Sequence, residues 1–141
     1  MTTQAQKQTV GIGKFVQAGL IGGAIAAVIN LILLFIGQAV NGGPLLVTPP
    51  GQSGVQGVLW FMAIVMSILP GVIAGALYGI LNRFTAKPTP IFLVIAAVVF
   101  IFMFFNPLSA AQGTTAILFL ELMHFVVAGL VIWRILGVAR N

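Results

Sequence analysis

Residues 15–40 read FVQAGLIGGAIAAVINLILLFIGQAV, and no charged side chain occurs from Phe15 to Asn82. A helix that crosses a bilayer needs about 20 mostly apolar residues, because the hydrocarbon core is about 30 Å thick. This stretch therefore predicts a transmembrane helix. The composition agrees, since 60% of the 141 residues are hydrophobic and 5% are charged, against about 25% charged in a soluble domain. A soluble fold could not cover its surface with so few charges.

Three further apolar stretches predict three more helices, at residues 57–81, 90–105 and 114–136. The loop before the second helix contains the helix-breaking pair Pro49-Pro50, and the third helix is expected to stop at Asn106-Pro107. The first apolar run continues to Ile36, too long for a signal-peptide core, so this helix is expected to stay in the mature chain. The predicted fold is all-α: a polytopic four-transmembrane-helix bundle, a single domain over residues 1–141.

The positive charges all fall where they would flank the helices on one side of the membrane. They are Lys7, Lys14, Arg83, Lys87, Arg134 and Arg140. Lys and Arg collect in cytoplasmic loops because they resist translocation. Both termini are therefore predicted on the cytoplasmic side of the membrane. Orientation in the membrane also explains the net charge of +5, so no nucleic-acid partner is expected.

Small residues on the first two helices predict how the bundle packs. They are Gly19 and Gly23 on the first helix and Gly71, Gly75 and Gly79 on the second. Water does not drive helices together inside lipid, so the close approach of small residues must do so. We expect an antiparallel contact between these two helices, since sequential helices usually pack as neighbours. Contact with a second copy of the chain, in a homo-oligomer, is the alternative.

Aromatic and basic residues near the helix ends predict contacts with the membrane surface. Trp60, Trp133 and Tyr78 occupy such positions, where amphipathic rings anchor a protein at the interface. The long side chain of Arg134 is expected to extend toward the headgroups. These features describe a bilayer partner and no particular activity.

The polar residues predicted inside the membrane are the candidate functional site. Glu121 and His124 are the only acid and the only histidine of the chain, and their spacing puts both on one side of the fourth helix. Asn30 and Ser67 fall at similar depths on the first two helices. An ionisable residue at this depth suggests a functional site, because its insertion into the membrane is costly. The alternative is a structural polar contact, in which the four side chains satisfy one another.

Two functional roles compete with that structural one. Glu121 could carry protons in a small oligomeric proton-coupled transporter, and His124 could supply the axial nitrogen of a haem or a chlorophyll-type pigment. The sequence requires no cofactor. A dimetal site of the Glu-x-x-His type needs further carboxylates, and the chain has none, so no metal site is predicted. With no Cys or Asp and one His, no catalytic triad can form, so we expect no enzyme.

Two short stretches carry a resemblance. Residues 26–31 read AAVINL and place Asn30 in the first helix, and residues 122–128 read LMHFVVA and place a Met-His pair in the last. They resemble an uncharacterised bacterial family of four-span integral membrane proteins, a domain of unknown function. The resemblance covers nearly the whole chain, implies a bacterial inner-membrane location and supplies no activity. Glu121 is not part of the pattern.

The expected function is a non-enzymatic membrane component that binds or assembles with partners. The long uncharged outer loop and the glycine rows suit contact with other membrane subunits or with copies of the same chain. A small subunit of a larger complex fits this description. The proton-coupled transporter and the pigment or haem subunit are the alternatives.

Cysteine labelling tests the predicted orientation. The chain contains no cysteine, so a single cysteine in place of Ser53 or of Thr85 reports alone. We expect a membrane-impermeant maleimide to label Ser53→Cys, and not Thr85→Cys, from the outside of intact spheroplasts. Labelling of both variants from the outside would contradict the orientation.

Overall fold

The computed structural model describes residues 10–140, most of which lie in four helices. These are α1 (Ile12–Asn41), α2 (Trp60–Phe84), α3 (Pro88–Ala110) and α4 (Thr114–Ala139). Each is long and apolar enough to cross a membrane, so the prediction of an all-α fold with four spans is confirmed. Lys7, one of the cations behind the predicted orientation, lies outside the described residues.

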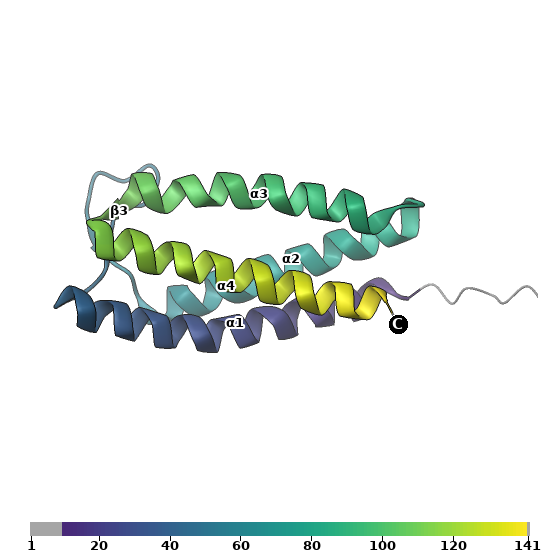
Figure 1. Cartoon of the computed structure of the whole chain (residues 1–141), viewed down its shortest axis with the longest axis horizontal. Coiled ribbons are helices and arrows are strands. Elements are labelled where there is room, and N and C mark those ends of the chain that lie inside the picture. The colour runs from purple at the N-terminus through teal and green to yellow at the C-terminus, as the bar shows by residue number, and fades with distance from the viewer. Residues whose placement is uncertain (1–9, 141) are drawn as a thin grey trace, which may run out of the picture.

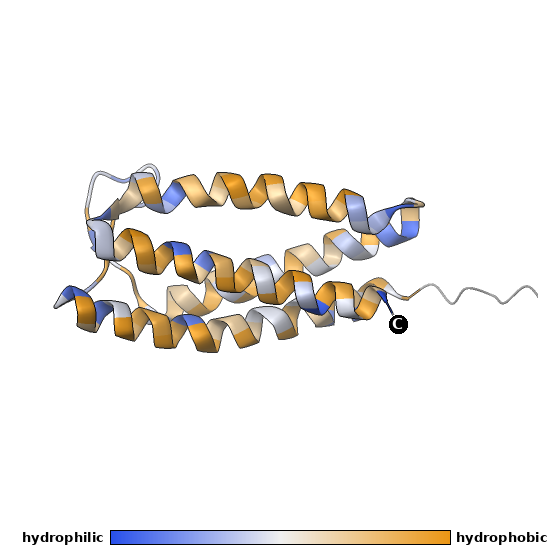
Figure 2. Ribbon diagram, viewed as in Figure 1, coloured by the Kyte–Doolittle hydropathy of each residue, from blue (hydrophilic) through white to orange (hydrophobic). Residues whose placement is uncertain are grey.

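The helices lie side by side along the long axis of the molecule (Figure 1). The start of α1, the turn between α2 and α3, and the end of α4 share one end of the bundle, which we call the terminal end. That end carries Lys14, Arg83, Lys87, Arg134 and Arg140. Hydrophobic residues dominate the middle of the helices (Figure 2). The side of the membrane that the terminal end faces stays a prediction.

A small sheet closes the opposite end of the bundle. Strands β1 (Leu46–Val47), β2 (Gln56–Gly57) and β3 (Ala111–Gln112) are antiparallel in the order β2-β1-β3. They join the α1–α2 loop to the turn before α4. The sequence did not predict them, because two-residue strands have no periodicity to detect. The second helix begins at Trp60 instead of residue 57, since Gln56 and Gly57 pair with β1.

The third helix is longer than predicted. We expected it to end at residue 105, before Asn106-Pro107, but α3 continues through Pro107 to Ala110. Proline removes one backbone hydrogen bond from a helix, here the bond to the carbonyl of Met103, and membrane helices tolerate such prolines. The Ser109 hydroxyl lies 3.1 Å from the carbonyl oxygen of Phe105 and 3.0 Å from that of Asn106, and donates to them. This bonding stabilises the last turn.

The backbones of α1 and α2 touch along the glycines that the sequence singled out: Gly19, Gly23, Gly71, Gly75 and Gly79. Gly19 and Gly71 face each other so closely that a Cβ on either would overlap the other's carbonyl group. A Cβ at Gly23 would lie 2.7 Å from the carbonyl oxygen of Ser67, and one at Gly75 would lie 2.8 Å from the Cα of Val16. Both separations are shorter than real Cβ contacts. The glycine row therefore serves a contact within the chain.

Helix α4 packs on the same part of α1 from another direction. A Cβ at Gly22 would lie 3.0 Å from the carbonyl oxygen of Leu130 and 3.0 Å from the Cα of Val131. Glycines at positions 19, 22 and 23 thus let both neighbours approach the α1 backbone. Helices α1, α2 and α4 form a tight three-helix unit.

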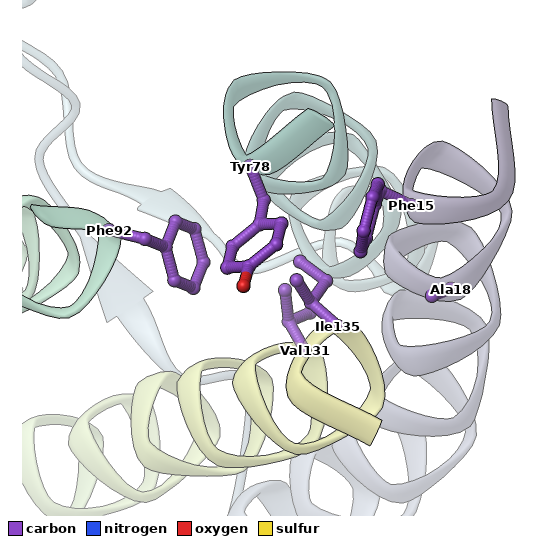
Figure 3. Packing of buried hydrophobic residues seen from close by; sticks show 6 residues of the cluster. All are labelled: Phe15, Ala18, Tyr78, Phe92, Val131 and Ile135. Atoms are coloured by element: carbon purple, nitrogen blue, oxygen red, sulfur yellow. The ribbon is translucent and has the colours of Figure 1, made fainter. Parts of the chain in front are cut away.

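Tyr78 is buried in the core, and the expectation that it anchors the membrane surface was wrong. Its ring lies between Phe15 of α1 and Phe92 of α3, with ring centroids 4.8 and 5.1 Å apart (Figure 3). Its hydroxyl is 2.7 Å from the hydroxyl of Thr89 at the start of α3. A tyrosine can be buried where its hydroxyl finds a partner, and Thr89 supplies one. Trp60 and Trp133 are exposed, as expected.

Helix α3 is the least buried of the four. Ten residues of α1 are buried but only Phe92 and Pro107 of α3. Near the terminal end, α3 is held by Phe92 against Tyr78. Farther along, Phe100 packs on Phe125 of α4, with centroids 4.9 Å apart. Aromatic side chains attach the length of α3 to the other helices, and at its end the carbonyl of Ala110 accepts a hydrogen bond from the backbone N–H of Thr48, at 2.8 Å.

Paired glycine substitutions test the α1–α2 contact. Gly75→Ala would press a methyl group onto the backbone of Phe15 and Val16, so we expect a loss of stability of about 1–3 kcal/mol, as for other overpacked sites. Gly129→Ala is the matched control, because a Cβ there meets nothing within 4 Å and alanine favours the helix. Thermal unfolding in detergent measures both. Equal unfolding temperatures for the two variants would contradict the close contact.

Candidate functional site

Asn30 is the centre of the polar contacts inside the bundle. It projects from the middle of α1 and is buried. Its side-chain nitrogen donates to the hydroxyl oxygen of Ser67 on α2, at 3.0 Å, and to the backbone carbonyl of Met123 on α4, at 3.3 Å. Ser67 in turn donates to the carbonyl of Ala63, at 2.7 Å. One amide therefore joins three helices where lipid offers no hydrogen-bond partner.

Glu121 faces the interior of the bundle from α4, and 8% of its surface is exposed. Both of its carboxylate oxygens are buried and have no hydrogen-bond partner among residues 10–140. The side-chain oxygen of Asn30 is also buried and also lacks a hydrogen-bond partner among these residues. All three atoms are acceptors while they carry no proton, so none can satisfy another. A protonated Glu121 carboxyl would supply a donor and remove the cost of a buried charge.

His124 bonds to its own helix. Its Nδ1 lies 2.6 Å from the backbone carbonyl of Leu120. A carbonyl oxygen only accepts, so Nδ1 carries the proton and the Nε2 of a neutral imidazole keeps a free lone pair. The ring is half-buried. This arrangement holds the ring as in metal-ligating histidines, whose second nitrogen commonly donates to a backbone carbonyl, so an axial role for Nε2 is chemically permitted.

The expected four-residue contact forms only in part. Asn30 and Ser67 bond to each other, but neither bonds to Glu121 or His124 in the described part of the chain. The i, i+3 spacing does place Glu121 and His124 on one side of α4. The ring of His124 turns back to the preceding turn, however, so the Glu121 carboxylate gains no donor from it. The hypothesis of one shared polar contact was wrong for these two residues.

The carbonyl of Met123 is the partner that sequence reasoning missed. Backbone acceptors leave no mark in a sequence, because every residue carries one.

The residues described here contain no group of three His, Cys, Asp or Glu that could hold a metal ion. The arrangement can fix the register of α1, α2 and α4, and it can take up or release a proton at Glu121.

Two substitutions separate the structural role of Asn30 from that of Glu121. Asn30→Leu removes both interhelical bonds, so we expect a loss of about 0.6–2 kcal/mol, the usual range for such bonds in membranes. Glu121→Gln keeps the shape and removes a charge with no partner, so we expect little or no loss. Unfolding in detergent by a denaturing co-detergent measures both free energies. A larger loss for Glu121→Gln would contradict this assignment.

A comparison with known protein families identifies the chain's relatives. The sequence model described as "Family of unknown function (DUF6069)" matches residues 11–141. No curated protein and no solved structure gives a significant match. The matched region includes all four helices and both stretches that carried the resemblance, residues 26–31 and 122–128. The protein is thus a four-helix membrane protein, and it belongs to this family of unknown function.

Proposed function

We propose that the protein is a non-enzymatic subunit of a bacterial membrane complex, which it joins through α3. The observation that carries the proposal is the contrast in packing. Helices α1, α2 and α4 are held by backbone contacts and by Asn30, whereas α3 buries only Phe92 and Pro107. A helix at the edge of a rigid unit is accessible to a partner helix without any change in that unit.

The outer side of α3 has the chemistry of an intramembrane interface. Val94, Val98, Ile101, Phe102 and Phe105 are all exposed, and their spacing places them along one side of the helix. This stripe of five side chains on α3 carries no charge, so a partner of matching chemistry is an apolar transmembrane helix. Phe residues bury large areas on contact and dominate interface energetics.

The stripe continues into a hollow at the end of the bundle opposite the terminal end, where the small sheet lies. The hollow has a volume of about 510 Å³. Phe102 and Phe105 line it from α3, and the segment Pro49–Gln52 lines it from the α1–α2 loop. A partner helix along α3 would thus meet a recess at the membrane surface. Both parts together offer a longer interface than the stripe alone.

The proposed location is the cytoplasmic membrane, with the terminal end on the cytoplasmic side. The support is the gathering of Lys14, Arg83, Lys87, Arg134 and Arg140 at that end. Cations there resist translocation and interact with anionic headgroups. A partner subunit would then reach the hollow from the outer side of the membrane.

Two valine substitutions of equal exposure test the role of α3. Val94 on α3 is 64% exposed and Val28 on α1 is 60% exposed. In the host membrane, we expect Val94→Trp to release the chain from a larger complex because the ring blocks close helix packing, and Val28→Trp to leave the complex intact. Native electrophoresis of tagged chain in mild detergent measures this.

Release by neither variant, or by both, would contradict the assignment to α3. Wild-type chain that migrates alone, at the mass of one 14.8 kDa chain with its detergent, would contradict assembly itself. Purified chain that forms a complex of the same size would make the partner a second copy.

Proton-coupled transport is the second candidate, and the state of Glu121 favours it. A buried carboxyl group without a partner among the described residues suits a group that takes and releases protons, as intramembrane acids do in transporters. Glu121→Gln distinguishes the candidates, since an amide cannot carry a proton. Proton flux in liposomes that this variant abolishes would favour transport, and complex formation that it leaves unchanged agrees with the assembly role.

A further inference from the structure

A second hollow lies at the terminal end of the bundle, between the start of α1 and the end of α4. It has a volume of about 290 Å³ and is lined by Lys14, Gln17, Ala18, Ile21, Arg134 and Val138. Beyond it the two helices close on each other, because Gly22 meets the backbone of Leu130 and Val131. The hollow is therefore a recess that opens near the membrane surface.

Two positive charges line this recess, and no acidic side chain lies beside them within residues 10–140. Lys14 and Arg134 come from different helices. The only acidic side chain of the sequence, Glu121, is thirteen residues from Arg134 on α4, or about 20 Å along a helix. The Nε of Arg134 is buried and has no hydrogen-bond partner within residues 10–140. Its guanidinium lies 5.6 Å from the centroid of the Trp133 ring, which restricts its position.

Three of the six lining residues are apolar: Ala18, Ile21 and Val138. Ala18 and Ile21 lie about one and two helical turns beyond Lys14, which at about 1.5 Å per residue is a span of about 10 Å for Ile21. Val138 adds an apolar wall from α4. The recess thus combines two cations and the polar Gln17 with apolar walls from both helices. An amphiphilic ligand with an anionic head matches both parts.

We propose that this recess binds the headgroup of an anionic phospholipid. Lys14 and Arg134 contact the phosphodiester, Gln17 donates a hydrogen bond to it, and one acyl chain lies along the exposed side chain of Ile21. Arginine binds phosphate through several N–H groups, and lysine through its point charge. Basic recesses between transmembrane helices bind such headgroups. Phosphatidylglycerol has the required net charge, whereas phosphatidylcholine does not.

Native mass spectrometry of the purified full chain measures the lipid affinity. The test variant is Lys14→Gln/Arg134→Gln, and the control is Arg83→Gln/Lys87→Gln, which removes two charges from the same end outside the recess. We expect the test variant to bind phosphatidylglycerol about tenfold or more weakly, given the usual contribution of a basic residue near a membrane. The control should stay within about twofold of wild type.

Three comparisons decide the outcome. Equal weakening by both double variants would reduce the effect to general charge attraction and overturn the proposal. Equal affinity for phosphatidylcholine and phosphatidylglycerol would also overturn it. Inorganic phosphate should not compete at millimolar concentrations, and competition would identify a soluble anion as the ligand instead. The single variant Lys14→Gln, at an exposed position, should weaken binding several-fold and decides the matter if the double variant does not fold.

Discussion

The contact between Gly19 of α1 and Gly71 of α2 is the constraint on which the rest of the structure depends. Two backbones meet there with no side chain between them. In a bilayer the hydrophobic effect does not hold helices together, so association depends on dispersion contact and on polar bonds. The dispersion attraction and the strength of the polar bonds both increase as the two backbones approach each other. This contact places Ser67 where Asn30 can reach it, and it leaves the other side of α1 free for α4.

The division into a tight unit and an attached helix follows from where the glycines are. Helices α1 and α2 carry them at their contact, and Gly22 admits α4. Helix α3 runs from Pro88 to Ala110 without a glycine, so side chains separate its backbone from those of the other helices. Its outer surface therefore stays available for a partner helix. The polar interior lies within the tight unit, where Asn30 fixes the register and Glu121 remains without a bond among the described residues.

The sequence predicted those features that depend on composition and on spacing. Apolar length predicted four spans, and glycines at intervals of four on α2 predicted a face for close packing. Prediction from the sequence failed where the outcome depends on a single hydrogen-bond partner that is distant in the sequence or on the backbone. The Ser109 hydroxyl bonds carbonyls in the last turns of α3, which continues past Pro107, and Thr89 gives the hydroxyl of the buried Tyr78 a partner. The ring of His124 bonds to a backbone carbonyl, so the expected bond with Glu121 does not form. Hydrophobic periodicity contains none of this information.

Solid-state NMR of the chain in lipid bilayers, with ¹³C-labelled glycine, tests the central contact most directly. We predict a strong cross-peak between Gly19 and Gly71, because their backbones are in van der Waals contact. The cross-peak should persist when labelled chain is diluted about tenfold with unlabelled chain, since the contact is within one molecule. Absence of the cross-peak would contradict the account, and so would its loss on dilution, which would place the contact between two copies.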